Sequence, residues 1–212
     1  MFTEEDIWYF KTTGFYKVRE ALPSDLIDRL NDVTSEQISD MHEPIVWEEK
    51  GDQKPENVRR LSKIFSRDEA YSEAATHPII LDALEGIIGP NIELLTNKHN
   101  HVMVRPGGSY PVPWHAGEET YDHTLITALI YLQESTVENG CVRIVPGSHN
   151  RPFRTTRRSK VSFYENDNYF RAVPIPMPRG GVILFNDCWL SRGRYKRLRS
   201  FSSQYDRGLS CS

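Results

Sequence analysis

The sequence predicts an α+β domain in which N-terminal helices pack around a core built as a β-sandwich or jelly roll. Helical patterns end at Gly89-Pro90, and short runs rich in Val, Ile, Leu, Tyr and Thr begin at Ile92. Turn sequences containing Pro-Gly or Asn-Gly separate these runs, as expected for many short antiparallel strands. Helices followed by such strands are typical of a single α+β domain.

The first helix and the first strand are predicted from local signals. Thr3 and Asp6 have the spacing of a capping box, which starts a short helix running through Phe10. Gly14 is suited to end this helix because glycine tolerates the left-handed conformation of a helix end. The segment Phe15–Arg19 then predicts a short strand.

The later elements follow from periodicity. A second helix is predicted to open at Pro23, because apolar residues recur on one face of the segment that follows. The polar and acidic segment 35–56 is predicted to be a loop or a weak helix. The remaining predicted elements are helices at 66–75 and 77–88 and strands at 102–105, 124–133, 141–145, 171–175 and 181–185.

Composition is that of an ordinary globular protein. The chain has 212 residues, 38% of them hydrophobic and 26% charged, which is enough for one domain with a sizeable core. No apolar run approaches the roughly 20 residues of a membrane span. The acidic N-terminus lacks the positive region of a secretory signal, and the three cysteines have no paired or metal-type spacing. We therefore expect a cytoplasmic protein without a membrane partner.

The net charge of −3 hides an asymmetry along the chain. Residues 191–212 contain six Lys or Arg and one acid, so residues 1–190 are distinctly acidic. An acidic body is a poor match for the phosphate backbone of nucleic acid. We expect no nucleic-acid partner, although the basic tail alone would allow that interpretation.

Several short motifs follow one another along the chain in a characteristic order. Gly14-Phe15 and Ile88-Gly89-Pro90 precede four longer motifs, which are Trp114–Gly117, Glu138–Cys141, Ile144–His149 and Arg179–Asp187. In this order and spacing the motifs resemble the phytanoyl-CoA dioxygenase family. The resemblance covers roughly residues 5–190 and predicts one domain over residues 1–190.

The resemblance implies a double-stranded β-helix, a cupin-like jelly roll, with helices packed outside it. It also implies Fe(II), 2-oxoglutarate and O₂ as cofactors and cosubstrates, and a small molecule as substrate. Two histidines and one carboxylate hold the iron in this class of enzyme. By resemblance His115 is the first iron ligand, whereas His149 is a structural residue that braces its loop.

Position 117 departs from the family pattern, which has Asp or Glu where this chain has Gly117. In one interpretation the missing carboxylate leaves a halide slot for chloride or bromide, as in halogenases of the same superfamily. In the second, Glu119 or Glu118 supplies a shifted carboxylate. Glu119 keeps the strand parity of His115, whereas Glu118 needs a bulge. In the third, the site has decayed.

Position 191 is the second departure, because Ser191 occupies the place of the second iron histidine and the family pattern stops after Leu190. Codons exist for which the frame one base later reads His-Ala-Gly-Gly-Ile-Asn, close to the family pattern. We therefore interpret residues 191–212, a basic tail with six serines, as out of frame. A true lineage-specific tail is the alternative.

Weaker candidates lie on the predicted strands and beside them. His99 and His101 precede a turn in the region where the family contacts 2-oxoglutarate, and Thr127 is expected to face the barrel interior. His99 and His101 with His115 also allow a cupin-like three-histidine metal site, although the cupin glutamate is absent. Residues expected to line the pocket, or simply to pack, are Trp114, Glu119, Tyr121 and Trp189.

A basic group precedes these strands. Arg59, Arg60 and Lys63 allow contact with an anionic substrate, but a solvated basic patch is the simpler interpretation. The function predicted from the whole pattern is iron- and 2-oxoglutarate-dependent oxidation of an unactivated C–H bond. Halogenation is the more specific form of this prediction. One alternative is hydroxylation with a shifted carboxylate, and the other is that the chain is an inactive, truncated family member.

Overall fold

A computed structural model describes residues 2–48, 52–97, 100–104, 125–150 and 172–186, and the backbone of residues 115–116 and 190–193. All described α-helices lie in the first half of the chain, with β1, β2 and β3 between them, and short strands predominate after α4. In chain order they are α1 (Glu4–Thr13), β1 (Phe15–Val18), α2 (Ser24–Ser39), β2 (Ile45–Trp47), η1 (Pro55–Asn57), β3 (Val58–Ser62), η2 (Ile64–Ser66), α3 (Glu69–Ala75), α4 (Pro78–Ile88), β4 (His101–Met103), β5 (His115–Ala116), β6 (Ile126–Ile130), β7 (Val142–Ile144), η3 (Ser148–Asn150), β8 (Val173–Ile175), β9 (Val182–Asn186) and β10 (Leu190–Gly193).

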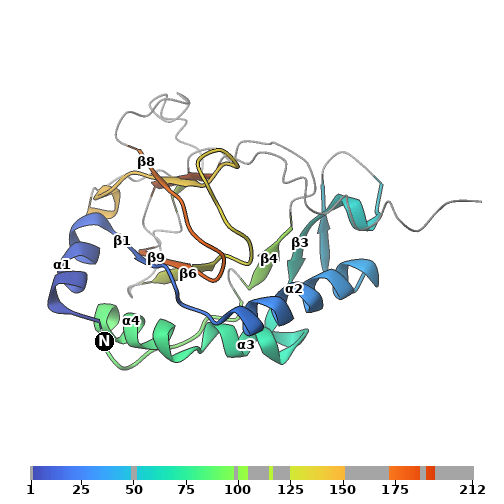
Figure 1. The fold of residues 1–212 in the computed structure, drawn as a ribbon, viewed down its shortest axis with the longest axis horizontal. Helices are drawn as coiled ribbons and strands as arrows, with labels where there is room; N and C mark the ends of the chain where they lie inside the picture. The colour runs from blue at the N-terminus through green and yellow to red at the C-terminus, as the bar shows by residue number, and fades with distance from the viewer. Residues whose placement is uncertain are drawn as a thin grey trace, which may run out of the picture.

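Three antiparallel sheets organise these strands. The first has the order β1-β9-β6, the second β5-β10-β7-β8 and the third β2-β3-β4. Figure 1 shows α3 and α4 below, the β1-β9-β6 sheet in the middle and the sheet that ends in β8 above. The predicted α+β class is confirmed, with helices gathered on one side of antiparallel sheets.

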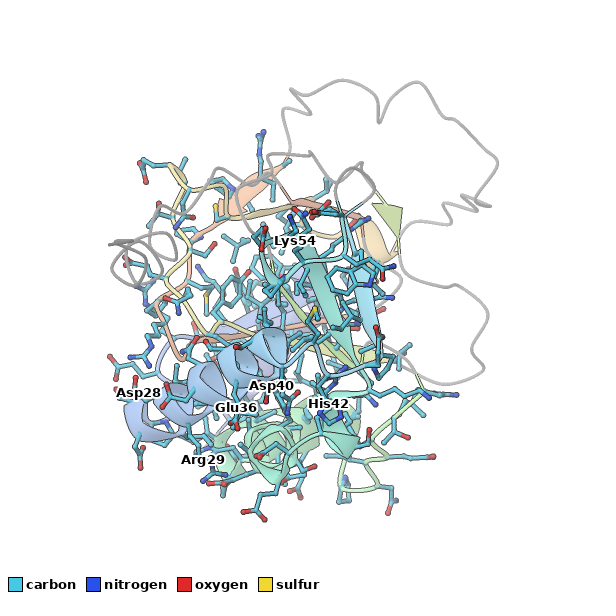
Figure 2. The ribbon with its side chains drawn as sticks, turned by 90° about the vertical axis from the view of Figure 1, so that its right-hand side faces the viewer. Asp28, Arg29, Glu36, Asp40, His42 and Lys54 are labelled. Atoms are coloured by element: carbon cyan, nitrogen blue, oxygen red, sulfur yellow. The ribbon has the colours of Figure 1, made fainter. Side chains whose placement is uncertain are left out.

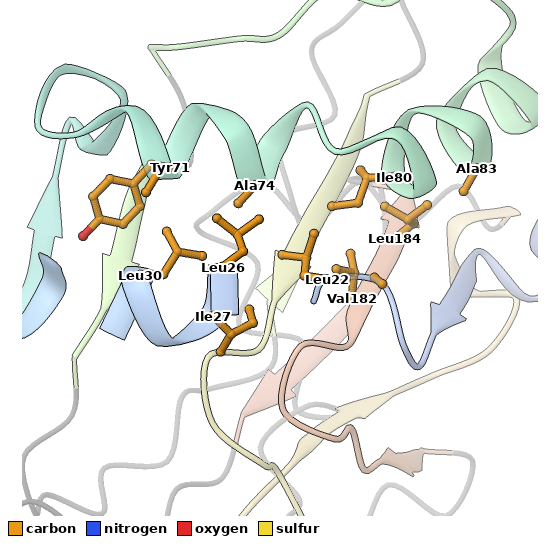
Figure 3. Close-up of a cluster of buried hydrophobic side chains, with 12 residues drawn as sticks. Leu22, Leu26, Ile27, Leu30, Tyr71, Ala74, Ile80, Ala83, Val182 and Leu184 are labelled. Atoms are coloured by element: carbon orange, nitrogen blue, oxygen red, sulfur yellow. The ribbon is translucent and has the colours of Figure 1, made fainter. Parts of the chain in front are cut away.

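Alternation along β9 separates two hydrophobic cores. Val182 and Leu184 are fully buried in a helix-side core, together with side chains from α2, α3 and α4 (Figure 3). Ile183 lies between them in sequence and belongs to a second, inter-sheet core with Ile144 and Ile175 of the β5-β10-β7-β8 sheet. Because successive strand residues point to opposite faces, the middle sheet is covered by helices on one face and by a sheet on the other.

Helix α1 forms as the sequence predicts. The side chain of Thr3 accepts a hydrogen bond from the backbone of Asp6, and the side chain of Asp6 accepts one from the backbone of Thr3. Gly14 ends the helix with φ of 83°, in the left-handed region that favours glycine. The capping box and the terminating glycine are therefore confirmed.

Helix α2 is amphipathic, with Leu26, Ile27 and Leu30 buried against the helix-side core. Figure 2 shows its charged side chains, among them Asp28 and Arg29, on the outer surface of the helix. Two exposed ion pairs, Arg29 with Glu73 and Arg179 with Asp28, join this helix to neighbouring segments. Such exposed pairs contribute little stability, so the buried face determines where α2 packs.

The β2-β3-β4 sheet corrects the prediction for residues 35–56. Helix α2 continues to Ser39, and residues 45–47 form strand β2 rather than a loop. Strand β3, which the sequence did not predict, is the central strand of this sheet. The strands are only three to five residues long, so pairing with distant segments rather than local propensity establishes them.

Arg67 joins this sheet to the helices through a set of hydrogen bonds. Its Nε donates to the carbonyl of Ser62 at 2.7 Å, and its terminal nitrogens donate to the carbonyls of His42 at 2.8 Å and Pro44 at 2.7 Å. A further bond reaches Oε1 of Gln37 in α2 at 3.1 Å. Burial lowers the pKa of the Arg67 guanidinium below its usual value. Arg67 is therefore a structural arginine with its donors used.

None of the helices among the described residues combines the length and apolar character that crossing a membrane requires.

Candidate active site

The predicted metal-site strands are adjacent in the structure. Strand β10 pairs with β5 on one side and with β7 on the other. The Cα of Ser191 is the register partner of His115 across one ladder and of Ile144 across the other. Three positions from segments far apart in the sequence therefore form one row across the sheet.

This row identifies the face of the sheet on which the site lies. Residues directly opposite each other in an antiparallel pair share a face of the sheet. Ile144 is fully buried in the inter-sheet core. Positions 115 and 191 therefore belong to the face that looks toward the β1-β9-β6 sheet, and the predicted place of the second iron histidine is directly opposite the predicted first ligand.

Strand β10 continues past residue 190, where the predicted domain ends and the predicted tail begins. Residues 191–193 continue the strand and pair with β7, so the first part of the predicted tail lies within the sheet. Residues 194–212 lie outside the described residues. The frame hypothesis for the tail stays a prediction.

Thr127 lies on strand β6 of the β1-β9-β6 sheet, across the inter-sheet core from the row of His115 and Ser191. It is the register partner of Phe185, which packs against the inter-sheet core. Its neighbours Ile126 and Ala128 are on the other face, and Ile126 packs toward the helices. Thr127 is half-buried on the face that looks toward the row of His115 and Ser191. A role in binding 2-oxoglutarate stays a prediction for it.

His101 lies in the third sheet, where Ser62 of β3 is its register partner. Val102, the next residue, packs against the helix-side core. Alternation places His101 on the other face, away from the helices. His99 lies outside the described residues, so its predicted pairing with His101 stays a prediction. The other predicted site residues outside the described part of the chain are Gly117, Glu118, Trp114, Glu119, Tyr121 and Trp189.

His149 has the structural role that the sequence predicts for it. Its Nε2 lies 3.1 Å from the carbonyl oxygen of Lys11 in the last turn of α1, and its ring lies against Gly14, where a Cβ atom would come within 2.3 Å of Nδ1. The backbone N–H of Gly147 donates to the carbonyl of Thr13 at 2.8 Å. Burial lowers the pKa of His149. The loop after β7 is thus fixed to the end of α1.

A pocket of about 240 Å³ lies away from these strands, between α1 and β1. Tyr16 lines it and is the register partner of Leu184, so the pocket lies on the helix side of the middle sheet. Burial and the hydrogen bond to Asp6 raise the pKa of Tyr16 to about 12. This pocket is therefore separate from the candidate active site.

The donor set does not fit a complete iron site of the two-histidine, one-carboxylate kind. His115 can serve as one ligand, but the position opposite it carries Ser191, and Gly117 has no side chain to offer. Within the described part of the chain, no three His, Cys, Asp or Glu side chains come together as a metal-binding group.

Comparisons with known proteins agree with this architecture. The profile of the family described as Phytanoyl-CoA dioxygenase (PhyH) matches residues 10–190. A protein of Stutzerimonas stutzeri, "Probable alpha-ketoglutarate-dependent hypophosphite dioxygenase", is 30% identical over 111 residues, a match that covers 51% of this chain and 38% of that protein. The chain thus spans well under half of this curated relative.

Solved structures share the fold over most of the chain. HygX from Streptomyces hygroscopicus, with nickel and 2-oxoglutarate bound, superposes with a TM-score of 0.70 at 18% identity, covering 92% of this chain and 82% of that chain. AviO1 from Streptomyces viridochromogenes superposes with a TM-score of 0.70 at 20% identity, covering 90% and 86%. At these identities the superpositions show the fold alone.

The family profile matches far more than half of the chain, which is enough to assign the family. The chain belongs to the phytanoyl-CoA dioxygenase family.

Proposed function

We propose that this protein is an iron- and 2-oxoglutarate-dependent oxygenase that acts on an unactivated C–H bond of a small molecule, with its iron site incomplete at position 191. The observation that carries the proposal is the direct pairing of Ser191 with His115 in the sheet. A family member with histidine at position 191 would have two imidazoles on adjacent strands and on one face. This register supports the proposal, because ligands at the two positions would lie on adjacent strands, and in this chain one of them is missing.

The β5-β10-β7-β8 sheet and the β1-β9-β6 sheet are, in this proposal, the two walls of a double-stranded β-helix. The inter-sheet core that they enclose supports this interpretation, because Ile144 and Ile183 come from different sheets and are both fully buried. A jelly roll places its ligands between such walls, where water is excluded and polar groups interact strongly.

Gly117 adds the finer proposal of halogenation. A residue without a side chain two positions after His115 in the sequence leaves room for an anion, and loss of the carboxylate leaves the site one negative charge short. Chloride or bromide fulfils both conditions. Hydroxylation with Glu118 or Glu119 as a shifted ligand, and an inactive chain, are the alternatives that the experiment below separates.

Restoring the missing imidazole tests the proposal. We expect Ser191→His to bind Fe(II) roughly tenfold or more tightly than the unchanged chain, since a second ligand on the adjacent strand completes a pair. The measurement is an anaerobic titration with Fe(II) and 2-oxoglutarate, followed by the metal-to-ligand absorbance band. His115→Ala in the Ser191→His background should remove the band.

Halide addition extends the same titration. In the Ser191→His protein, chloride should tighten 2-oxoglutarate binding, and Gly117→Asp should abolish that dependence. A chloride response that survives Gly117→Asp would refute the halide slot. Ser191→His protein that folds but shows no band would contradict the proposed function, whereas a band in the unchanged chain would show that other side chains complete the iron site.

A further inference from the structure

The pocket between α1 and β1 lies at the surface and takes no part in the candidate active site. In the described part of the chain β1 is the outer strand of the β1-β9-β6 sheet, and α1 packs beside it (Figure 1). The pocket has a volume of about 240 Å³. Its lining residues come from these two elements and are Glu5, Asp6, Trp8, Tyr9, Tyr16 and Lys17.

Helical spacing brings three of the lining side chains to one side of α1. Glu5, Trp8 and Tyr9 are three and four residues apart, so they are neighbours on the helix surface. Trp8 is 65% exposed, whereas the helix packs into the fold through the buried Phe10. The side of α1 that carries Trp8 is therefore available to a ligand.

The aromatic rings of the pocket are held at a fixed angle to one another. The rings of Tyr9 and Tyr16 are inclined by 77°, with their centroids 6.4 Å apart. Phe2 packs edge-on against Tyr16 at 4.8 Å, and the Tyr16 hydroxyl donates a hydrogen bond to Oδ1 of Asp6 at 2.8 Å. With the indole of Trp8 these rings give the pocket a lining of π systems, whose negative faces attract organic cations.

The charges that line the pocket are negative on balance. Glu5 and Asp6 contribute two carboxylates, and Lys17 contributes one ammonium group. Hydrogen bonds from Thr3 and Tyr16 lower the pKa of Asp6, so its carboxyl group stays ionised. The acidic first turn also offsets the partial positive charge at the start of α1. A cation is therefore favoured over an anion in this pocket.

We propose that this pocket binds a small organic cation, an alkylated ammonium group of a molecule in solution, between its aromatic rings and the carboxylate of Glu5. Such a group suits both kinds of lining, because its methyl groups contact the rings while its charge is attracted by π faces and carboxylates. A strongly hydrated cation would lose water without gaining these apolar contacts. The pocket is smaller than the roughly 300–1,000 Å³ of typical ligand sites, so it suits a compact head group.

Glu4 and Glu5 provide a matched pair of variants. Both are exposed and lie in the first turn of α1, but only Glu5 lines the pocket. Glu4→Lys and Glu5→Lys change the net charge by the same amount and disturb the helix dipole in the same way. A general electrostatic or stability effect would therefore be equal in the two variants.

Two further variants test the aromatic and the charged parts of the lining separately. Trp8→Leu keeps an apolar side chain but removes the π face, so we expect it to weaken cation binding about threefold or more. Lys17→Met removes the cation among the lining residues and keeps a long side chain. We expect Lys17→Met to tighten cation binding about twofold.

The experiment measures choline binding to metal-free protein in EDTA by saturation-transfer NMR of the N-methyl protons. Tetramethylammonium is the second probe, 3,3-dimethylbutan-1-ol is the neutral analogue of the same shape, and sodium chloride keeps the ionic strength constant. We expect saturable binding of both cations with dissociation constants of about 1–10 mM, and binding of the neutral analogue at least about fivefold weaker. Glu5→Lys should weaken choline binding about fivefold or more, while Glu4→Lys stays within about twofold of the unchanged chain.

Three outcomes would overturn the proposal. They are equal affinities for choline and its neutral analogue, equal effects of Glu4→Lys and Glu5→Lys, and no saturable binding of either cation. Phosphatidylcholine vesicles carry the same head group, and we expect no co-sedimentation of the protein with them. Co-sedimentation that Trp8→Leu abolishes would assign the pocket to a membrane surface and overturn its assignment to a molecule in solution. Because neither iron nor 2-oxoglutarate is present, failure of the iron titration leaves these outcomes unaffected.

Discussion

The two faces of the β1-β9-β6 sheet differ in the groups that they bury. On the helix side, buried apolar side chains from α2, α3 and α4 meet Val182 and Leu184, and the neighbouring Arg67 uses its donors on backbone carbonyls and Gln37. On the other side, a smaller core adjoins Thr127 and the row of His115 and Ser191. The helix side holds the larger apolar core, whereas the other side combines a smaller core with the polar positions 115, 127 and 191.

This division is consistent with the chemistry of a binding site. A satisfied polar group contributes to stability, while an unsatisfied one is unfavourable until a ligand arrives. Arg67 and Arg60 illustrate the difference within one region of the molecule. Arg67 is hydrogen-bonded to Gln37, to the segment of His42 and Pro44 and to Ser62, whereas Arg60 has a buried nitrogen that finds no hydrogen-bond partner within the part of the chain that the structure describes.

The largest effect is expected in the helix-side core. Ile27 is fully buried among apolar side chains, so Ile27→Ala should lower the free energy of unfolding by about 2–5 kcal/mol through lost burial and a residual cavity. Thr127→Val is the control on the other face, and we expect its effect to stay below about 1 kcal/mol. Urea denaturation followed by circular dichroism measures both. Equal losses in the two variants would contradict the division.

A smaller effect is expected at Arg67. Arg67→Met keeps much of the side-chain length but removes the donors that Arg67 supplies to the carbonyls of Ser62 and His42, and one of the two donors to the carbonyl of Pro44. We expect a loss of roughly 1–3 kcal/mol in the free energy of unfolding. Arg60→Met is the matched variant and should be neutral or slightly stabilising, because it removes a buried donor that has no partner. A loss at Arg60 as large as that at Arg67 would refute the contrast between the two arginines.

Much of the helix side could be predicted from sequence because its signals are local. The capping box of Thr3 and Asp6, the glycine at 14 and the apolar face beginning at Leu26 each lie within one or two helical turns. Such patterns depend on neighbouring residues and not on the rest of the fold.

The third sheet and the state of Arg60 could not be predicted in this way. Strand β3 begins Val-Arg-Arg-Leu, and the two adjacent arginines conceal the alternation of a half-buried strand. Its partners are β2 and the distant β4, so the pairing is set by the tertiary structure. The interpretation of Arg59, Arg60 and Lys63 as a solvated patch holds for Lys63, which is exposed, and is wrong for the buried Nε of Arg60.

The order of motifs predicts that positions 115 and 191 lie together, and the structure confirms this proximity, while metal binding there stays a prediction. The direct register between these positions depends on β10 lying between β5 and β7. A crossover of this kind leaves no pattern in the local sequence, since its partners come from segments far apart in the chain.

The smallest effect is expected from the pH dependence of His149. Burial lowers its pKa below the ordinary value of 6.5, so the unfolded chain takes up a proton at this residue more readily than the folded chain does. The stability contribution is therefore present above about pH 6.5 and is lost as the pH falls through the lower pKa of the folded state. Protonation would also alter the contact between Nε2 and the carbonyl of Lys11.

His149→Gln tests this dependence because glutamine does not titrate and can still reach the carbonyl of Lys11. We expect the difference in unfolding free energy between the unchanged chain and the variant to shrink as the pH falls from 7.5 toward 5, by an amount smaller than the effect of Arg67→Met. Urea denaturation at several pH values measures it. A difference in unfolding free energy that grows on acidification would contradict this prediction. It would mean that the helix dipole at the end of α1 favours the charged imidazole by more than burial disfavours it.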